Sequence, residues 1–219
     1  MSFANYLEHT MLKPEASEEE IKKLCAEAAA YNMRSVCVNP CHVALSKRAL
    51  EGSGVSVVTV IGFPLGAERS EVKALEAKLA VHDDGADEVD MVLNIGALKE
   101  GRYNVVCDDI TAVVKAAAPA PVKVIIETCL LTDEEKITAC RVIKEAGAHF
   151  VKTSTGFSKG GAVVSDVKIL SAEAKKLDLL VKAAGSIRDL QTALAMINAG
   201  ADRIGTSAGV KILREESER

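Results

Sequence analysis

The sequence predicts a (β/α)8 TIM barrel in which residues 1–219 form a single domain. Short runs rich in Val and Ile alternate with amphipathic stretches, a pattern typical of βα units around a parallel sheet. Eight such runs occur, and eight units in 219 residues match the lower end of the size of this fold. The rival fold is an open doubly wound sheet, but the glycine-rich dinucleotide fingerprint that would follow its first strand is missing.

The predicted strands are apolar runs bounded by polar or turn-forming residues. They cover residues 6–10, 34–39, 55–63, 88–94, 122–128, 149–154, 179–184 and 202–206. No linker or low-complexity stretch divides the chain between them. Active sites of such barrels lie at the C-terminal ends of the strands, so the reactive residues are expected there.

Helices are predicted between the strands by apolar residues that recur on one helical face. Ser17 with Glu20, and Thr132 with Glu135, have the spacing of capping boxes at helix N-termini. The clearest apolar faces are formed by residues 21, 24, 25 and 28; by 72, 75 and 79; by 106, 110, 113, 114 and 117; and by 163, 167, 170, 174 and 177.

The composition excludes several classes of function. The formal net charge is −4, there is no Trp and only 3% of residues are aromatic, which argues against a nucleic-acid partner. No apolar run approaches the ~20 residues of a membrane span, and the first residues lack a signal-peptide pattern. We therefore expect a cytoplasmic protein that binds neither nucleic acid nor a membrane.

The cysteines and histidines do not form a metal-site pattern. Cys37, Cys41 and His42 lie close together, but Pro40 intervenes and no second cluster completes a tetrahedral site. We expect no metal, and we expect reduced cysteines within the core rather than disulfides. The six cysteines are at 25, 37, 41, 107, 129 and 140, and the histidines are scattered at 9, 42, 82 and 149.

Lys152 stands inside a predicted apolar strand, immediately before a loop of Ser, Thr and Gly. Because burial disfavours charged lysine, we expect this residue to be neutral, paired or functional. Lys182 follows 30 residues later, close to one βα repeat, so the two side chains should project from adjacent strands. Each ammonium lowers the pKa of the other, and a neutral amine can attack a carbonyl to form a Schiff base. Asp90, facing the barrel axis, would assist proton transfer.

Several alternatives remain open at this stage. The spacing does not decide which lysine is the nucleophile, and it also fits an internal charge network that only fills the top of the barrel. Lys123 is interpreted as a structural strand residue or a partner of Glu127. Asn94 shares the face of Asp90 and is expected to point toward the axis as well.

Three turns that contain glycine follow the last three predicted strands, at 155–161, 184–188 and 205–209. Small residues let backbone N–H groups approach an anion, and the loops after strands seven and eight often hold phosphate in this fold. Any one of these loops is also an ordinary turn. Together, they favour a phosphorylated substrate.

At this point the chain resembles the deoxyribose-phosphate aldolases from about residue 6 to residue 210. The motifs are Glu-His-Thr with Leu-Lys-Pro at 8–14, Val-Cys-Val-Asn-Pro at 36–40, Ile-Gly-Phe-Pro-Leu-Gly at 61–66, Glu-Val-Asp-Met-Val-Leu-Asn at 88–94, Val-Lys-Thr-Ser-Thr-Gly-Phe at 151–157 and Val-Lys-Ala-Ala-Gly at 181–185. The resemblance implies a class I lyase without metal or cofactor, acting in deoxyribonucleoside catabolism. It would reversibly cleave 2-deoxy-D-ribose 5-phosphate to D-glyceraldehyde 3-phosphate and acetaldehyde.

The resemblance also implies roles for individual residues. It assigns the Schiff base to Lys152, the lowering of that amine's pKa to Lys182 and the proton relay to Asp90. It places Cys37 in the pocket as a residue that is not a required nucleophile; a small buried core cysteine is the competing interpretation. The remaining substrate and phosphate contacts are expected at Thr153, Gly156, Gly185, Ser186, Gly205 and Ser207.

The chain departs from the family in two loops. Ser186 replaces a frequent glycine and would narrow the phosphate site or add a hydroxyl donor, and Ala208 stands where some members have a second serine. Family habit indicates a homodimer. Residues 211–219 are expected to be a fraying helix end, with closure over the phosphate loop as the alternative.

Two other functions are considered. One is a Schiff-base aldolase that uses another aldehyde or a keto acid. This is disfavoured because no arginine is evident near Lys152 to hold a carboxylate. The other is a silent barrel that binds sugar phosphates without forming a Schiff base.

Overall fold

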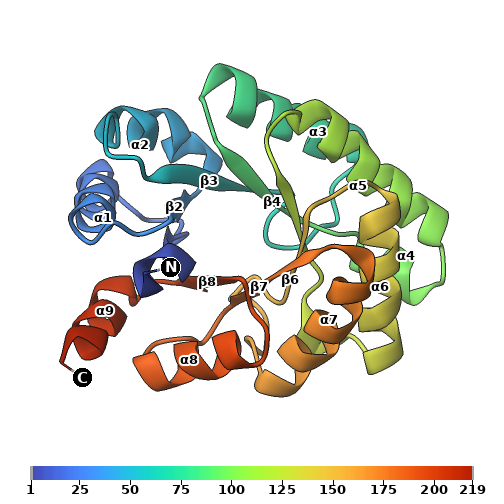
Figure 1. Ribbon diagram of the computed structural model, residues 1–219. Coiled ribbons are helices and arrows are strands. Elements are labelled where there is room, and N and C mark those ends of the chain that lie inside the picture. The colour runs from blue at the N-terminus through green and yellow to red at the C-terminus, as the bar shows by residue number, and fades with distance from the viewer. Residues whose placement is uncertain (1, 219) are drawn as a thin grey trace.

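The computed structural model describes residues 2–218, which form a closed barrel of eight parallel strands surrounded by helices (Figure 1). Each strand pairs with the next one in sequence, and the first closes the barrel by pairing with the last. In that closing pair, Leu7 lies opposite Ile204 and Glu8 opposite Gly205. The predicted (β/α)8 barrel is therefore confirmed.

All eight predicted strands are present. Five of them, β2 to β6, end one to three residues earlier than predicted, and some of the polar residues that follow have other contacts. Asn94, for example, caps the next helix by accepting from the Ala97 N–H at 3.0 Å. The strands are β1 Leu7–Met11, β2 Ser35–Val38, β3 Ser56–Ile61, β4 Glu88–Val92, β5 Val122–Ile125, β6 Phe150–Lys152, β7 Leu180–Ala184 and β8 Arg203–Thr206.

Helices connect the strands on the outside of the barrel, and both predicted capping boxes are present. They begin α1 and α6, at Ser17 and Thr132. The α-helices are α1 Glu18–Ala30, α2 Val43–Ala49, α3 Ser70–Lys78, α4 Ile95–Lys99, α5 Tyr103–Ala117, α6 Asp133–Glu145, α7 Val164–Leu177, α8 Leu190–Asn198 and α9 Gly209–Ser217. Shorter helical turns are η1 Phe3–Tyr6, η2 Pro40–His42, η3 Leu79–Asp83 and η4 Thr128–Leu130. None of the helices within 2–218 is long and apolar enough to span a membrane.

The main apolar core lies between the strands and the helices. Val89 and Met91 of β4 belong to it, whereas Asp90 between them points to the barrel interior and contacts lysines there. A second, smaller apolar cluster fills the interior beside β2 and β3. It contains Leu12, Cys37, Val58 and Val60, with Phe63 packed against it. The interior thus has an apolar part and a charged part.

The predicted apolar face of α3 is wrong. Val72, Leu75 and Leu79 are 52%, 55% and 43% exposed, and Lys73 is fully buried instead. Lys73 forms a 2.6 Å ion pair with Asp109 of α5 and donates to the Val92 carbonyl at 3.1 Å. These contacts turn the helix so that a lysine faces the barrel, which a reading of apolar periodicity cannot detect.

Two further expectations are corrected. The C-terminal helix α9 is not solvated on all sides, because Ile212 and Leu213 are buried and Glu215 accepts from the Leu190 N–H at 2.8 Å. Arg219 lies outside the described residues. The cysteines are free, but only three of the six are buried, and Cys41 is exposed.

Asp109→Ala should lower the free energy of unfolding by about 3–5 kcal/mol, because it leaves the Lys73 ammonium buried without its partner. Urea denaturation monitored by circular dichroism measures this. The matched control is Glu19→Ala, which breaks the exposed Lys22–Glu19 pair and should cost less than about 1 kcal/mol. Equal effects of the two substitutions would contradict a structural role for the buried pair.

Candidate active site

Neighbouring strands bring the predicted reactive side chains together inside the barrel. Lys152 of β6 and Lys182 of β7 are direct partners in the sheet register, so both project inward at the same height, as their 30-residue spacing predicts. Asp90 of β4 is the partner of Lys123 of β5. Because side chains alternate along a strand, these four inward residues are separated from the helices by the sheet itself.

Asp90 is the centre of this cluster. Its Oδ2 accepts from Lys152 Nζ at 2.7 Å and from Lys182 Nζ at 2.6 Å, while Oδ1 accepts from Lys123 Nζ at 2.9 Å. The carboxylate is fully buried, and Lys152 and Lys182 are only 3% and 1% exposed. One carboxylate therefore contacts three ammonium or amine groups in a site almost free of solvent.

The sequence prediction missed two buried carboxylates of the same cluster. Glu8 of β1 accepts from Lys182 through Oε2, and its Oε1 lies 3.8 Å from Lys123 Nζ. Glu88, two residues before Asp90, pairs with Lys123 at 2.6 Å. Glu88 alternates with apolar residues in its strand, which is the signal that could have placed it on the inner face, whereas Glu8 is followed by His9 and has no such signal.

Lys123 is therefore part of the charged cluster, and its predicted pairing with Glu127 is wrong. Glu127 follows β5 with φ +52° and turns to Thr155, accepting from the backbone N–H and from the hydroxyl of that residue. This contact joins the loop after β5 to the loop after β6. Asn94 does not reach the axis either, because it is the helix cap described above.

The charges of this cluster shift the pKa values of Lys152 and Lys182 in opposite directions. Burial raises the pKa of Asp90, but the charges of Lys123, Lys152 and Lys182 outweigh it and hold that pKa well below its usual range. Burial lowers the pKa of Lys152, and the nearby Lys182 lowers it further against the pull of Asp90. For Lys182 burial also opposes the charge, but Asp90 and Glu8 outweigh it and raise its pKa. These directions favour a neutral amine at Lys152 beside a stable ammonium at Lys182.

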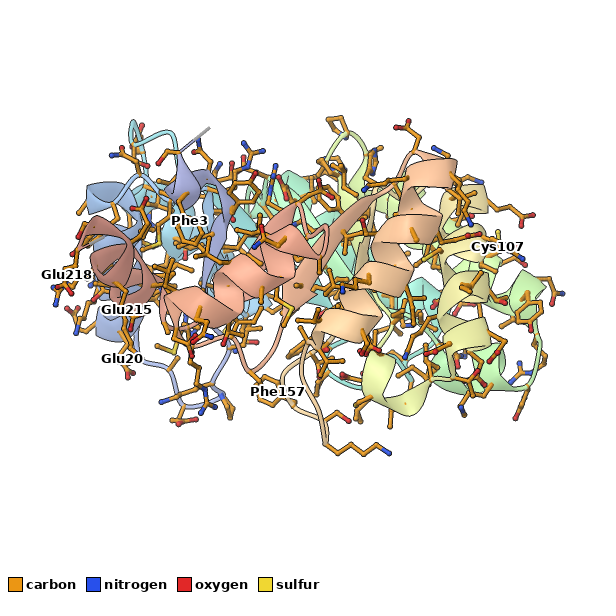
Figure 2. All side chains as sticks on the ribbon, turned by 60° about the horizontal axis from the view of Figure 1, so that its bottom comes forward. Phe3, Glu20, Cys107, Phe157, Glu215 and Glu218 are labelled. Atoms are coloured by element: carbon orange, nitrogen blue, oxygen red, sulfur yellow. The ribbon has the colours of Figure 1, made fainter. Side chains whose placement is uncertain are left out.

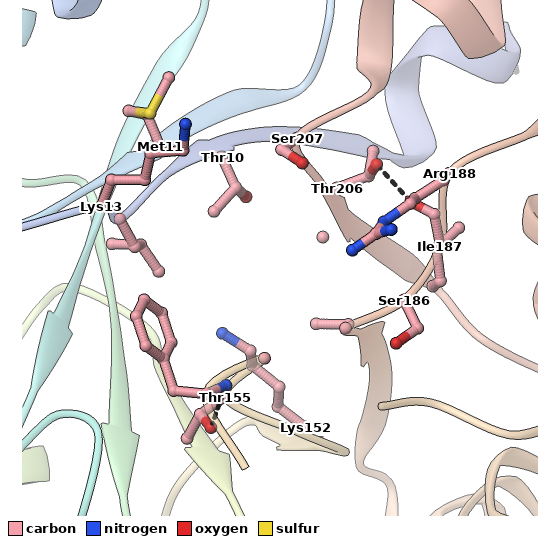
Figure 3. Close-up of a pocket in the computed structure, with 16 residues that line it drawn as sticks. Thr10, Met11, Lys13, Lys152, Thr155, Ser186, Ile187, Arg188, Thr206 and Ser207 are labelled. Carbon is pink, nitrogen blue, oxygen red and sulfur yellow. Dashed lines mark hydrogen bonds between the residues drawn. The ribbon is translucent and has the colours of Figure 1, made fainter. Parts of the chain in front are cut away.

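Lys152 also lines a cavity of about 420 Å³ at the C-terminal ends of β6, β7, β8 and β1 (Figure 3). The five predicted phosphate-loop residues all line it: Gly156, Gly185, Ser186, Gly205 and Ser207. Arg188 and Ser207 lie across this cavity from Lys13, so the cations Arg188 and Lys13 face the same space as Lys152. The expectation that no arginine lies near Lys152 is wrong, since Arg188 shares its cavity.

The aromatic ring of Phe157 bounds the cavity at the loop after β6. Phe157 lines the cavity, is 52% exposed and meets Phe63 edge to face at 5.3 Å between ring centroids. Phe157 and Phe3 lie toward opposite ends of the barrel (Figure 2).

Ser186 adopts φ +64°, a left-handed conformation that glycine favours, so the serine is accommodated at this turn with backbone strain.

Two of the predicted binding residues do not line the cavity. Thr153 uses its hydroxyl to join β6 to β7, donating to the Ala184 carbonyl and accepting from the Ala184 N–H at 3.1 Å each. Cys37 is 1% exposed within the small apolar cluster, and burial raises its pKa to about 11. Neither belongs to the residues that line the cavity.

The residues present suit covalent chemistry on a carbonyl compound. A neutral amine at the floor of a cavity is a nucleophile, and a carboxylate and an ammonium beside it can exchange protons with the adduct. Cations and backbone N–H groups at the rim suit an anionic substituent. Within 2–218, no group of three or more His, Cys, Asp or Glu side chains is arranged to hold a metal ion.

Comparison with known proteins agrees with this geometry. A family model described as DeoC/LacD family aldolase matches residues 7–216. The chain belongs to this aldolase family. The resemblance to deoxyribose-phosphate aldolases is thereby confirmed, and the chain is an enzyme of the lyase class.

Relatives within the aldolase family match the chain over almost its whole length. A deoxyribose-phosphate aldolase of Clostridium tetani is 58% identical and is matched over 98% of this chain and 99% of the relative. A crystal structure of a putative deoxyribose-phosphate aldolase from Coccidioides immitis has a TM-score of 0.96 at 44% identity, covering 98% of this chain and 85% of that one. The deoxyribose phosphate aldolase of Aeropyrum pernix, described as tetrameric, has a TM-score of 0.92 at 36% identity and coverages of 98% and 90%.

In the native protein, Cys37 should resist iodoacetamide at pH 8, whereas exposed Cys41 should react. With a pKa of about 11, only roughly one Cys37 thiol in a thousand is ionised at that pH, and burial blocks access as well. Peptide mass spectrometry before and after unfolding measures both residues. Native alkylation of Cys37 as fast as that of Cys41 would show that Cys37 is accessible from the cavity.

Proposed function

We propose that the protein reversibly cleaves 2-deoxy-D-ribose 5-phosphate to D-glyceraldehyde 3-phosphate and acetaldehyde, with residues 1–219 acting as one domain. The observation that supports this most directly is the position of Lys152, which contacts Asp90 beside Lys182 and also lines the cavity. The family and the names of its close relatives supply the substrate class.

The reaction begins with addition of the neutral Lys152 amine to the C1 aldehyde of the open-chain sugar phosphate. The nitrogen lone pair forms the N–C bond while the C=O π pair moves to oxygen, and proton transfer gives a carbinolamine. Loss of water leaves an iminium, with Asp90 and Lys182 placed to relay the protons.

The iminium then acts as an electron sink. The C2–C3 bond breaks as the C3 hydroxyl loses its proton, glyceraldehyde 3-phosphate leaves, and the bonding pair forms an enamine of acetaldehyde on Lys152. Protonation of the enamine carbon regenerates an iminium, and addition of water to that iminium releases acetaldehyde and restores the amine. The proton that Lys182 retains keeps Lys152 able to begin the next cycle.

The phosphate group would lie at the rim formed by the loops after β7 and β8. Gly185, Ser186, Gly205 and Ser207 present small side chains and backbone there, and Arg188 adds a guanidinium. Gly156 of the loop after β6 completes this wall. Thr153 and Cys37 would act only by supporting the residues that line the cavity.

A charged sugar phosphate does not cross a lipid bilayer unaided, which supports action of the enzyme in the cytoplasm.

Lys152→Ala should abolish turnover while leaving the barrel folded, because among residues 2–218 the other lysine that lines the cavity, Lys13, makes no contact with Asp90. Sodium borohydride in the presence of 2-deoxyribose 5-phosphate should leave a two-carbon or reduced sugar adduct on Lys152 of the wild type, detected by peptide mass spectrometry. Lys159→Ala, in the exposed part of the loop after β6, is the matched control and should keep both activity and adduct.

The outcomes separate the competing functions. Appreciable turnover of the folded Lys152→Ala variant would remove this lysine as the nucleophile. No adduct on any lysine of the wild type would favour a silent binding barrel. Because Arg188 shares the cavity, pyruvate is the donor to compare with acetaldehyde: an adduct with pyruvate and none with acetaldehyde would favour a keto-acid aldolase.

We further propose that two copies associate through α3. The exposed residues Val72 and Leu75 of α3 and Leu79, which begins η3, form one apolar stripe. Because a helix turns by about 100° per residue, Glu71 and Lys78 lie along the same edge of this stripe. Glu71 precedes Leu75, the middle residue of the stripe, and Lys78 follows it. An antiparallel two-fold pairing would therefore place Leu75 against Leu75 and each Glu71 beside the Lys78 of the other copy, as an isologous interface requires.

Leu75→Glu should shift the protein toward monomer, because two carboxylates would meet at the two-fold axis. Sedimentation velocity across a range of concentrations measures the shift. Leu180→Glu is the control, since Leu180 is also exposed, at 42%, but begins β7, which does not neighbour β3 or β4, the strands that α3 connects. A wild type that stays monomeric at every concentration would contradict the interface, as would equal effects of the two substitutions.

A further inference from the structure

The contacts with Asp90 do not distinguish Lys152 from Lys182. Both amines approach the same carboxylate oxygen, at 2.7 and 2.6 Å, and both side chains are almost completely buried. Their backbones are direct partners in adjacent strands. If Asp90 were the only carboxylate present, either lysine would be equally suited to hold the proton.

Glu8 breaks this symmetry. It contacts Lys182 through Oε2, and none of the hydrogen bonds or ion pairs within 2–218 joins it to Lys152. Lys182 therefore contacts two buried carboxylates, whereas Lys152 contacts one.

Gly205 makes the contact between Glu8 and Lys182 possible. Glu8 lies on β1 and Lys182 on β7, so the side chain of Lys182 must cross β8, where Gly205 is the register partner of Glu8. A Cβ atom at Gly205 would stand 3.2 Å from Lys182 Cε and 3.0 Å from Ala184 Cβ, both tighter than normal packing. The missing side chain thus leaves the space through which Lys182 reaches the first strand.

We propose that Glu8 is a positioning residue that assigns the proton to Lys182 and thereby makes Lys152, rather than its neighbour, the amine nucleophile. This inference rests on the proposed Schiff-base function. Glu8 touches neither the cavity nor the reacting atoms and acts through Lys182 alone.

The charges around Lys182 agree with this assignment. Burial opposes its charge, but Asp90 and then Glu8 raise its pKa above the usual value, while the pKa of Lys152 is lowered. A single proton shared by two adjacent amines goes to the one with more anionic contacts, and like-charge repulsion keeps the second amine neutral. The other ionisable groups of this interior are Cys37 on β2, Glu88 on β4 and Lys123 on β5.

Glu8→Gln tests the proposal because glutamine keeps the shape of the side chain and removes only its charge. Lys152 and Lys182 would then share the proton through Asp90, and at neutral pH Lys152 would be protonated in a large fraction of molecules. We expect kcat/KM near pH 7 to fall at least about twofold relative to the variant's own value at high pH, where the shared proton is lost. The acid limb of the profile therefore moves to higher pH.

Three comparisons make this experiment specific. Glu88→Gln removes another buried carboxylate, one that contacts Lys123 and not Lys182, so its normalised pH profile should follow the wild type. Glu8→Asp keeps the charge and should restore most of the neutral-pH activity. If Glu8→Gln does not fold, Gly205→Ala pushes Lys182 away from Glu8 and should move the limb in the same direction.

Borohydride trapping with 2-deoxyribose 5-phosphate gives a second readout. In Glu8→Gln the yield of adduct on Lys152 should rise with pH, whereas in the wild type it should already be high near pH 7. A folded Glu8→Gln whose kcat/KM and trapping profiles are parallel to those of the wild type would overturn the role of Glu8. A wild type that forms no adduct on Lys152 would instead overturn the proposed function, so the two failures are distinguishable.

Discussion

The ionised carboxylate of Asp90, buried among three lysines, is the constraint on which the rest of the structure depends. Removing a charge from water costs several kcal/mol, so such a group persists only if its partners are held at short distance. The barrel meets this requirement because β4, β5, β6 and β7 are neighbours and each contributes one inward side chain at a similar level. The apolar cluster beside β2 and β3 closes the other part of the interior and keeps water away.

The charged interior and the cavity above it have different tasks. Beneath the cavity, fixed charges determine which groups hold protons, and only Lys152 belongs to both regions. At the rim, Arg188 and the glycine-containing loops offer positive charge and backbone donors to an anion. A substrate with an aldehyde at one end and a phosphate at the other spans the two regions. The site of the covalent reaction is thus separated from the phosphate-binding rim by the length of the substrate.

Much of the fold and part of the site could be predicted from the sequence. The strands could be recognised because their Val and Ile side chains are buried between the sheet and the helices. Lys152, Asp90 and Lys182 could be recognised because each is a charged residue that interrupts such an apolar run. Glu8 was overlooked because polar His9 and Thr10 follow it, so it does not interrupt an apolar run. The face of α3 was misassigned because Lys73 is held inward by Asp109. In both cases the orientation of the side chain is determined by a partner that is distant in sequence. Side-chain orientation in the loops, as for Arg188 and Glu127, likewise depends on contacts that no local pattern encodes.

The empty position at Gly205 has a consequence for protein design. A lysine can reach across an intervening strand only if that strand lacks a side chain at the crossing point. Grafting a reactive lysine and its carboxylate onto another eight-stranded barrel would then require a third change. A residue of the intervening strand, which takes no part in the reaction, would have to be replaced by glycine. Scaffold searches that match only the geometry of functional groups would miss it, because the determinant is a volume left unfilled.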